Sequence, residues 1–147
     1  MAGIDLRSPA FVNHGRLPHS CARNEENISP PLSWSGVPEE ASELALLCES
    51  LDSPPGSLPL WLVTGIDPRR TGLESGTSHP GSYEHENGHG EDGWGGPTAS
   101  NDGPHRYLFR LYALPAPVSL PHDVTSDAAR EVLGQQSVSH GTLVGLY

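Results

Sequence analysis

The chain has 147 residues, and its 8 basic residues against 18 acidic ones give a formal net charge of -10. All the basic residues are arginines, which excludes chemistry that depends on a lysine amine, such as a Schiff base or a P-loop lysine. The same balance argues against nucleic-acid binding, which needs a basic surface, and against docking on anionic lipid, which needs clustered cations. The length fits one domain spanning residues 1–147.

The N-terminal residues lack the apolar stretch of a secretory signal, and no run approaches the roughly 18 apolar residues of a membrane helix. A cytoplasmic protein is therefore the expectation. The chain has two cysteines, Cys48 in an apolar run and Cys21 in a polar one. This arrangement favours two free thiols over a disulfide.

Strand signals dominate the chain. Taken in order, the residues predict a short helix near 38–42, strands over 43–50, 61–66 and 107–114, a helix over 127–132 and a strand over 142–147. Either Thr125 or Ser126 can cap the second helix, and Gly134 can end it. Short strands between proline and glycine turns predict an antiparallel or mixed β-sandwich.

The segment 71–104 has nine glycines and no clear periodicity, which predicts a long functional or mobile loop. It carries His79, His85 and His89 among acidic residues. The spacing of the last two would suit a metal on a helix, but the glycines between and beside them exclude a helix. A solvated loop without a dedicated metal site is therefore expected, with adventitious metal binding left open.

Two motifs have competing interpretations. Asp52 directly follows an apolar strand and precedes two prolines, so it either closes an Asx turn, the favoured reading, or orients a histidine or ligand. His105 follows a glycine-rich loop, and alternation places Tyr107 on the same side of the strand. A structural and a functional role for His105 are equally supported. Motifs for P-loops, nucleophile elbows and zinc proteases are absent.

Taken together, these segments resemble the bacterial phosphatidylethanolamine-binding proteins, also known as Raf-kinase-inhibitor-like proteins. The resemblance implies a mainly β fold in which a large central sheet packs on a smaller one, with a short C-terminal helix and long loops. The matching runs are NISPPLSWSGVPEE at 27–40, DSPPG at 52–56, WLVTGI at 61–66, GWGGP at 93–97, HRYLFRLYAL at 105–114 and LVGLY at 143–147.

The resemblance also implies a small pocket for phosphate-like groups. Carried over position by position, its ligand-binding residues here are Asp52, Pro54, Trp61, Gly96, Pro97, His105 and Tyr107. Two positions depart from the family pattern, because Ser50 replaces an aspartate and Leu60 replaces the histidine before Trp61. A charge-assisted hydrogen bond contributes about 1.5–3 kcal/mol, so losing one donor predicts anion binding about 10- to 100-fold weaker.

These features predict a non-enzymatic ligand-binding or regulatory protein with no cofactor, metal or catalytic residues. The family is linked to lipid head-group binding, kinase inhibition and, in some members, protease inhibition, and relatives often form homodimers. One alternative is a small-molecule hydrolase using His105 and Asp52, for which Ser50 is the only nearby hydroxyl. Another is a scaffold with a vestigial pocket, whose loop 71–104 contacts a protein partner.

Overall fold

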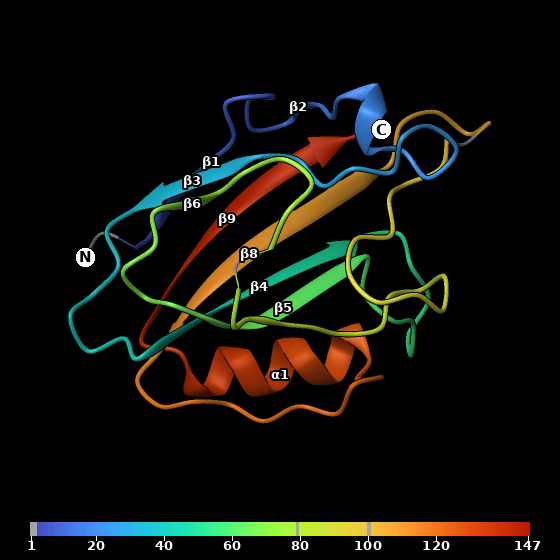
Figure 1. Ribbon diagram of the computed structural model, residues 1–147. Coiled ribbons are helices and arrows are strands. Elements are labelled where there is room, and N and C mark those ends of the chain that lie inside the picture. The colour runs from blue at the N-terminus through green and yellow to red at the C-terminus, as the bar shows by residue number, and fades with distance from the viewer. Residues whose placement is uncertain (1–2, 79, 100) are drawn as a thin grey trace.

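The computed structural model describes residues 3–78, 80–99 and 101–147, which form two β-sheets and one α-helix (Figure 1). The smaller sheet has the strand order β1-β3-β6, and the larger has the order β2-β9-β8-β4-β5-β7. The expected mainly β fold class is confirmed. The elements are β1 (Asp5–Arg7), β2 (Gly15–Arg16), the 3-10 turn η1 (His19–Cys21), β3 (Leu32–Ser35), β4 (Glu43–Ser50), β5 (Trp61–Ile66), β6 (Gly72–Leu73), β7 (Tyr83–Glu84), β8 (Arg106–Leu114), α1 (Ser126–Gln136) and β9 (Ser139–Leu146).

Strands β4 and β8 form the centre of the larger sheet. They pair antiparallel in unbroken register up to the pair of Ser50 and Tyr107. Both strands are buried along nearly their whole length, which explains why the sequence shows continuous apolar runs rather than alternation. The predicted bounds of β4 and β5 are confirmed, and β8 begins one residue earlier than predicted.

Each face of the larger sheet is covered by a different layer, as Figure 1 shows. The smaller sheet covers one face, where Trp34, Trp61 and Phe109 are buried. Helix α1 covers part of the other face, where Leu133 packs among side chains that include Leu47. The sheet therefore has a hydrophobic core on both sides.

Helix α1 is longer than predicted. Its N-cap is Thr125, whose side chain accepts a hydrogen bond from the backbone N–H of Ala128. The predicted end at Gly134 is wrong, because the helix runs on to Gln136. A helix interior tolerates a glycine at a cost of about 1 kcal/mol when packing holds the helix, and here Ala129 and Leu133 are fully buried. No helix in the described part of the chain is long and apolar enough to span a membrane.

Two further sequence predictions need correction. The predicted helix near 38–42 is wrong, since the chain makes only a turn there, closed by the Ala41 N–H on the Pro38 carbonyl, before β4 begins. Strand β9 begins three residues before the predicted 142. Its early part carries Gly141, where a Cβ would lie 2.2 Å from the Ile4 carbonyl oxygen. The position facing the core is thus a glycine, which contributes no apolar signal.

The segment 71–104 is more ordered than predicted, because it contains β6 and β7. The expectation of a solvated loop is wrong for His85, which is 1% exposed. Its ring is held between the Pro121 carbonyl and the Thr64 hydroxyl, and burial lowers its pKa. His79 lies outside the described residues.

Both cysteines are free thiols, as expected, and both are buried. Cys21 is buried despite its polar neighbours in the sequence. Burial raises the pKa of Cys21 to about 11 and that of Cys48 well above its usual value. The thiolate is the reactive form, so we expect neither thiol of the folded protein to react with Ellman's reagent at about pH 8, whereas both react in guanidinium chloride. Rapid titration of a thiol in the folded protein would contradict this expectation.

Candidate functional site

The end of β4 meets the start of β8 at one edge of the molecule. Ser50 and Tyr107 form the last register pair of these antiparallel strands, so Asp52 just after β4 lies beside His105 just before β8. The Asp52 Oδ2 atom is 3.7 Å from the His105 Nδ1 atom and accepts a 3.4 Å hydrogen bond from the Arg106 backbone N–H. The antiparallel register of β4 and β8 therefore brings together a carboxylate that follows one strand and an imidazole that precedes the other.

His105 is held in place by its backbone. Its N–H and carbonyl both pair with the backbone of Tyr147, which extends the ladder between β8 and β9 by one residue. The His105 side chain is 34% exposed, so its ring is open to a small ligand. At 3.7 Å its contact with Asp52 is too long for a hydrogen bond and acts as an electrostatic attraction when the imidazole is protonated.

Asp52 does not close the favoured Asx turn. Its carboxylate reaches across to the start of β8, while its own N–H donates to the Ser50 hydroxyl at 3.2 Å. Tyr107 is 6% exposed, and burial, followed by the nearby Cys48 and Asp52, raises its pKa. Its phenol is therefore protonated at neutral pH and can donate a hydrogen bond.

A second group of predicted residues surrounds the start of β5. The Gly95 N–H donates to the Leu60 carbonyl at 2.8 Å, and the Gly96 N–H donates to the Asn27 side chain at 2.8 Å. The Pro97 carbonyl accepts from the Arg23 N–H. These bonds anchor the glycine turn to β5 on one side and to the segment after η1 on the other.

Trp61 belongs to the core and not to an open binding surface. It is 1% exposed, its indole N–H donates to the Glu84 carboxylate at 2.9 Å, and its ring meets Trp94 edge-on. A ligand at the surface has no access to this indole, so Trp61 supports the site by packing.

Leu60 lines a cavity of about 370 Å³ between the loop before β5 and the loop after β7. Neither His105 nor Tyr107 lines it. His89 does, and its Nε2 atom is 3.3 Å from the Gly96 carbonyl oxygen. Sequence reasoning assigned His89 to a solvated loop, and no local pattern shows that its loop folds back beside Leu60. Pro54 and Ser50 line a separate cavity of about 330 Å³ beside the start of α1.

Comparison with known proteins identifies the family of this chain. The model of the family described as phosphatidylethanolamine-binding protein matches residues 7–147. The chain belongs to this family. A UPF0098 protein of Methanothermobacter thermautotrophicus is 38% identical over 149 residues, which cover 98% of each protein.

Solved structures of family members share the fold over nearly the full length. A phosphatidylethanolamine-binding-protein homologue from Chlamydia trachomatis superposes with a TM-score of 0.84 at 31% identity, covering 100% of this chain and 98% of the other. Escherichia coli YbcL, described as a new member of the mammalian family, gives a TM-score of 0.88 at 26% identity, covering 99% and 98% of the two chains. The two-sheet fold with its C-terminal helix is thus the family fold, and the family's name describes binding and states no reaction.

Within this family fold, the described residues contain no group of three or more side chains suited to hold a metal ion. Ser50, Asp52, His105 and Tyr107 form one group, which we call the strand-end site. Leu60, Gly96 and Pro97 lie around the neighbouring turn.

Proposed function

We propose that this protein is a non-enzymatic binding protein that weakly holds a small anion of the phosphate type at the strand-end site. The observation that carries the proposal is the open imidazole of His105, 3.7 Å from the Asp52 carboxylate, whose charge also acts on the buried, protonated phenol of Tyr107. An imidazolium and a phenol are the kinds of donor that bind phosphate oxygens.

The same geometry explains why binding is weak. The Asp52 carboxylate repels an anion, although the Arg106 N–H and an imidazolium at His105 offset part of its charge. Leu60 supplies no donor at all. The site therefore lacks the donor that a histidine at position 60 would supply. The loss of one charge-assisted hydrogen bond reduces the affinity by about 10- to 100-fold.

The contacts of Ser50 favour binding over hydrolysis. Its hydroxyl accepts from the Asp52 N–H, and among the described residues no hydrogen bond joins it to His105. A nucleophilic serine needs a base within hydrogen-bond reach, so the hydrolase alternative lacks an activated nucleophile. A regulatory role, such as inhibition of a kinase or a protease, is the second part of the proposal, and family membership supports it.

Titration with inorganic phosphate and with O-phosphorylethanolamine tests the binding proposal. The titration is monitored by NMR of the histidine rings and tyrosines at constant ionic strength. At about pH 6, where histidines carry part of their charge, we expect signals of His105 and Tyr107 to shift with a Kd of about 1 mM or weaker. His105→Ala removes the response at Tyr107. Absence of any shift at these residues supports the scaffold alternative, and turnover of a phenyl ester that His105→Ala abolishes supports the hydrolase alternative; either result overturns the proposal.

Restoring an imidazole at position 60 provides a gain-of-function prediction. We expect Leu60→His to lower the phosphate Kd by about 10- to 100-fold, because it adds one charge-assisted donor. Leu58→His is the matched control, because Leu58 lines the same cavity. The new histidine adds an equal charge two positions away, on the other side of Pro59. Equal tightening by both variants shows a general charge effect and contradicts a specific role for position 60.

A further inference from the structure

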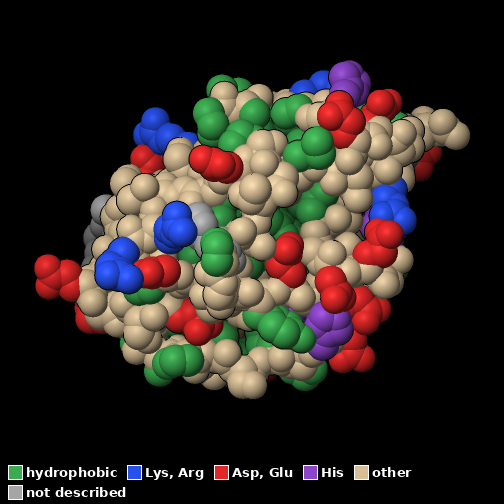
Figure 2. Space-filling model, viewed as in Figure 1, with side chains coloured by type: hydrophobic (Ala, Val, Ile, Leu, Met, Phe, Trp, Pro, Cys, Tyr) green, Lys and Arg blue, Asp and Glu red, His purple; other side chains and the backbone are tan. Residues whose placement is uncertain are grey.

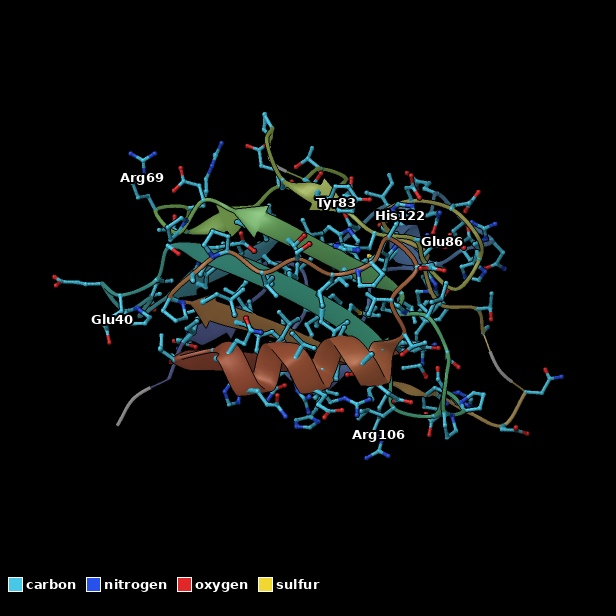
Figure 3. The ribbon with its side chains drawn as sticks, turned by 90° about the horizontal axis from the view of Figure 1, so that it is seen from below. Glu40, Arg69, Tyr83, Glu86, Arg106 and His122 are labelled. Carbon is cyan, nitrogen blue, oxygen red and sulfur yellow. The ribbon has the colours of Figure 1, made fainter. Side chains whose placement is uncertain are left out.

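Three polar side chains from separate segments form a continuous hydrogen-bonded chain at the β7 edge of the larger sheet. The Tyr83 hydroxyl lies 2.7 Å from the His122 Nδ1 atom, and the His122 Nε2 atom lies 2.7 Å from the Asp92 Oδ1 atom. Tyr83 is on β7, Asp92 is in the loop after it, and His122 is in the strap, which we define as residues 115–125 between β8 and α1. Figure 3 shows Tyr83 and His122 together, far from the labelled Arg106 next to the strand-end site.

The Asp92 carboxylate and the Tyr83 hydroxyl, at the two ends of this chain, determine which atom donates in each hydrogen bond. An ionised carboxylate only accepts hydrogen bonds, so the His122 Nε2 atom carries the proton toward Asp92. In the neutral imidazole the Nδ1 atom is then an acceptor, and the Tyr83 hydroxyl donates to it. The order is hydroxyl, imidazole, carboxylate, which is the arrangement that activates an oxygen nucleophile.

The surrounding contacts hold this chain rigidly. The Tyr83 ring packs edge-on against His85, with ring centroids 4.6 Å apart, and edge-on against His122. His85 is buried and anchored to the strap through the Pro121 carbonyl. The His122 carbonyl accepts from the Glu86 N–H at 3.0 Å. The His122 imidazole is therefore held in place from both sides. This keeps the distance between the base and the Tyr83 oxygen constant.

Access distinguishes Tyr83 from the other tyrosines. Tyr83 is 49% exposed, whereas each of the others is at most 7% exposed. The His122 side chain is 40% exposed, so an incoming reagent can reach the oxygen and the base together. The three buried tyrosines are Tyr107, Tyr112 and Tyr147.

We propose that Tyr83 is a nucleophilic tyrosine and a site of covalent acylation, with His122 as its base and Asp92 as the group that orients and stabilises that base. The Tyr83 oxygen forms a bond to the carbonyl carbon of an activated acyl donor, and its proton passes to the His122 Nδ1 atom. The bond from the carbonyl carbon to the leaving group breaks, and the leaving group takes that proton. The products are the O-acyl tyrosine and the protonated leaving group.

The charge around the site selects the donor. Asp92 contributes a negative charge, and Glu86 lies beside His122 in Figure 3, where its backbone pairs with that of Asp92 in an isolated antiparallel β-bridge. Acidic side chains also gather along the right-hand side of the surface in Figure 2, several of them around a histidine. Uncharged or cationic donors, such as neutral esters and thioesters, are therefore favoured over anionic acyl phosphates.

The test uses the folded chain with two acetyl donors, neutral N-acetylimidazole and anionic acetyl phosphate, and locates the acetyl groups by peptide mass spectrometry. We expect N-acetylimidazole to label Tyr83 about 100-fold faster than it labels free N-acetyltyrosinamide, and acetyl phosphate to react more slowly. Hydroxylamine removes the label, because O-acetyl tyrosine is an ester that hydroxylamine cleaves. His122→Gln reduces the rate at Tyr83 by about 100-fold, the usual size of a general-base contribution.

The variant Asp92→Asn separates activation from simple bracing of the strap. It retains a side chain of the same shape, and under the proposal it slows acetylation of Tyr83 while thermal unfolding confirms that the variant is folded. His140→Gln makes the same substitution at an exposed histidine of β9, outside both sites, and leaves the rate unchanged. If Tyr83 reacts no faster than the free amino acid, or if the two variants lower stability but not the rate of a folded sample, the hydrogen-bonded chain only braces the strap and the proposal fails.

Discussion

Substituting Gly96 by alanine is expected to lower the free energy of unfolding by about 3 kcal/mol and the melting temperature by roughly 10 °C. A Cβ atom at this position would lie 1.9 Å from the Cys21 carbonyl oxygen and 3.0 Å from the Arg23 nitrogen. Both neighbours are backbone atoms, which cannot move aside as the end of a flexible side chain can. Urea unfolding followed by tryptophan fluorescence measures the loss.

Gly134→Ala is the matched control for this glycine. Nothing lies within 4 Å of a Cβ at Gly134, and the residue is inside α1. Alanine is the better helix former by about 1 kcal/mol, so this variant is expected to be more stable than the natural protein. A Gly96→Ala protein as stable as the natural one would show that the turn does not dock against η1 as tightly as described.

Removing the charge of Arg130 is expected to cost about 3 kcal/mol of stability at neutral pH. The guanidinium donates to both oxygens of Glu49 at 3.1 and 2.8 Å, and also to Asp127. The Glu49 side chain is only 7% exposed, so Arg130→Met leaves a nearly buried carboxylate without its cation. The Arg130 side chain is itself 41% exposed, which places the loss at the lower end for buried pairs. Urea unfolding at neutral pH measures it.

Two comparisons make this result specific. Arg69→Met breaks an ion pair with Asp67 in which the side chains are 90% and 42% exposed, so we expect no measurable loss of stability, because solvent screens an exposed pair. The double variant Arg130→Met/Glu49→Gln should recover most of the lost stability, because the amide carries no unpaired charge. Equal losses for Arg130→Met and Arg69→Met would contradict the role of burial.

The strand predictions succeeded where a segment carries its own apolar signal. Strands β4 and β5 each contain a continuous apolar run, at 44–48 and 61–63, and their predicted bounds are the observed ones. Strand β9 was predicted too short because its core-facing position 141 is a glycine that lets the backbone of Ile4 approach. The predicted helix near 38–42 had favourable residues but only a single turn of chain before β4.

The candidate site was only partly visible in the sequence. The order of motifs nominated Asp52 and His105, while their contact depends on the register of β4 and β8. Pro54 and Trp61 were nominated in the same way, yet Trp61 is in the core. No sequence signal indicated that His89 would reach the cavity beside Leu60, because a glycine-rich loop can return to the sheet in many ways.

The amino-acid sequence by itself determined the mainly β class, the family and the absence of lysine chemistry, since these follow from local apolar runs, ordered motifs and composition. Only the tertiary structure decided which polar groups meet. Tyr83, Asp92 and His122 come from three segments, and their hydrogen bonds exist because the strap crosses the β7 edge. Such contacts depend on the summed packing of the whole sheet, which no short stretch of sequence encodes.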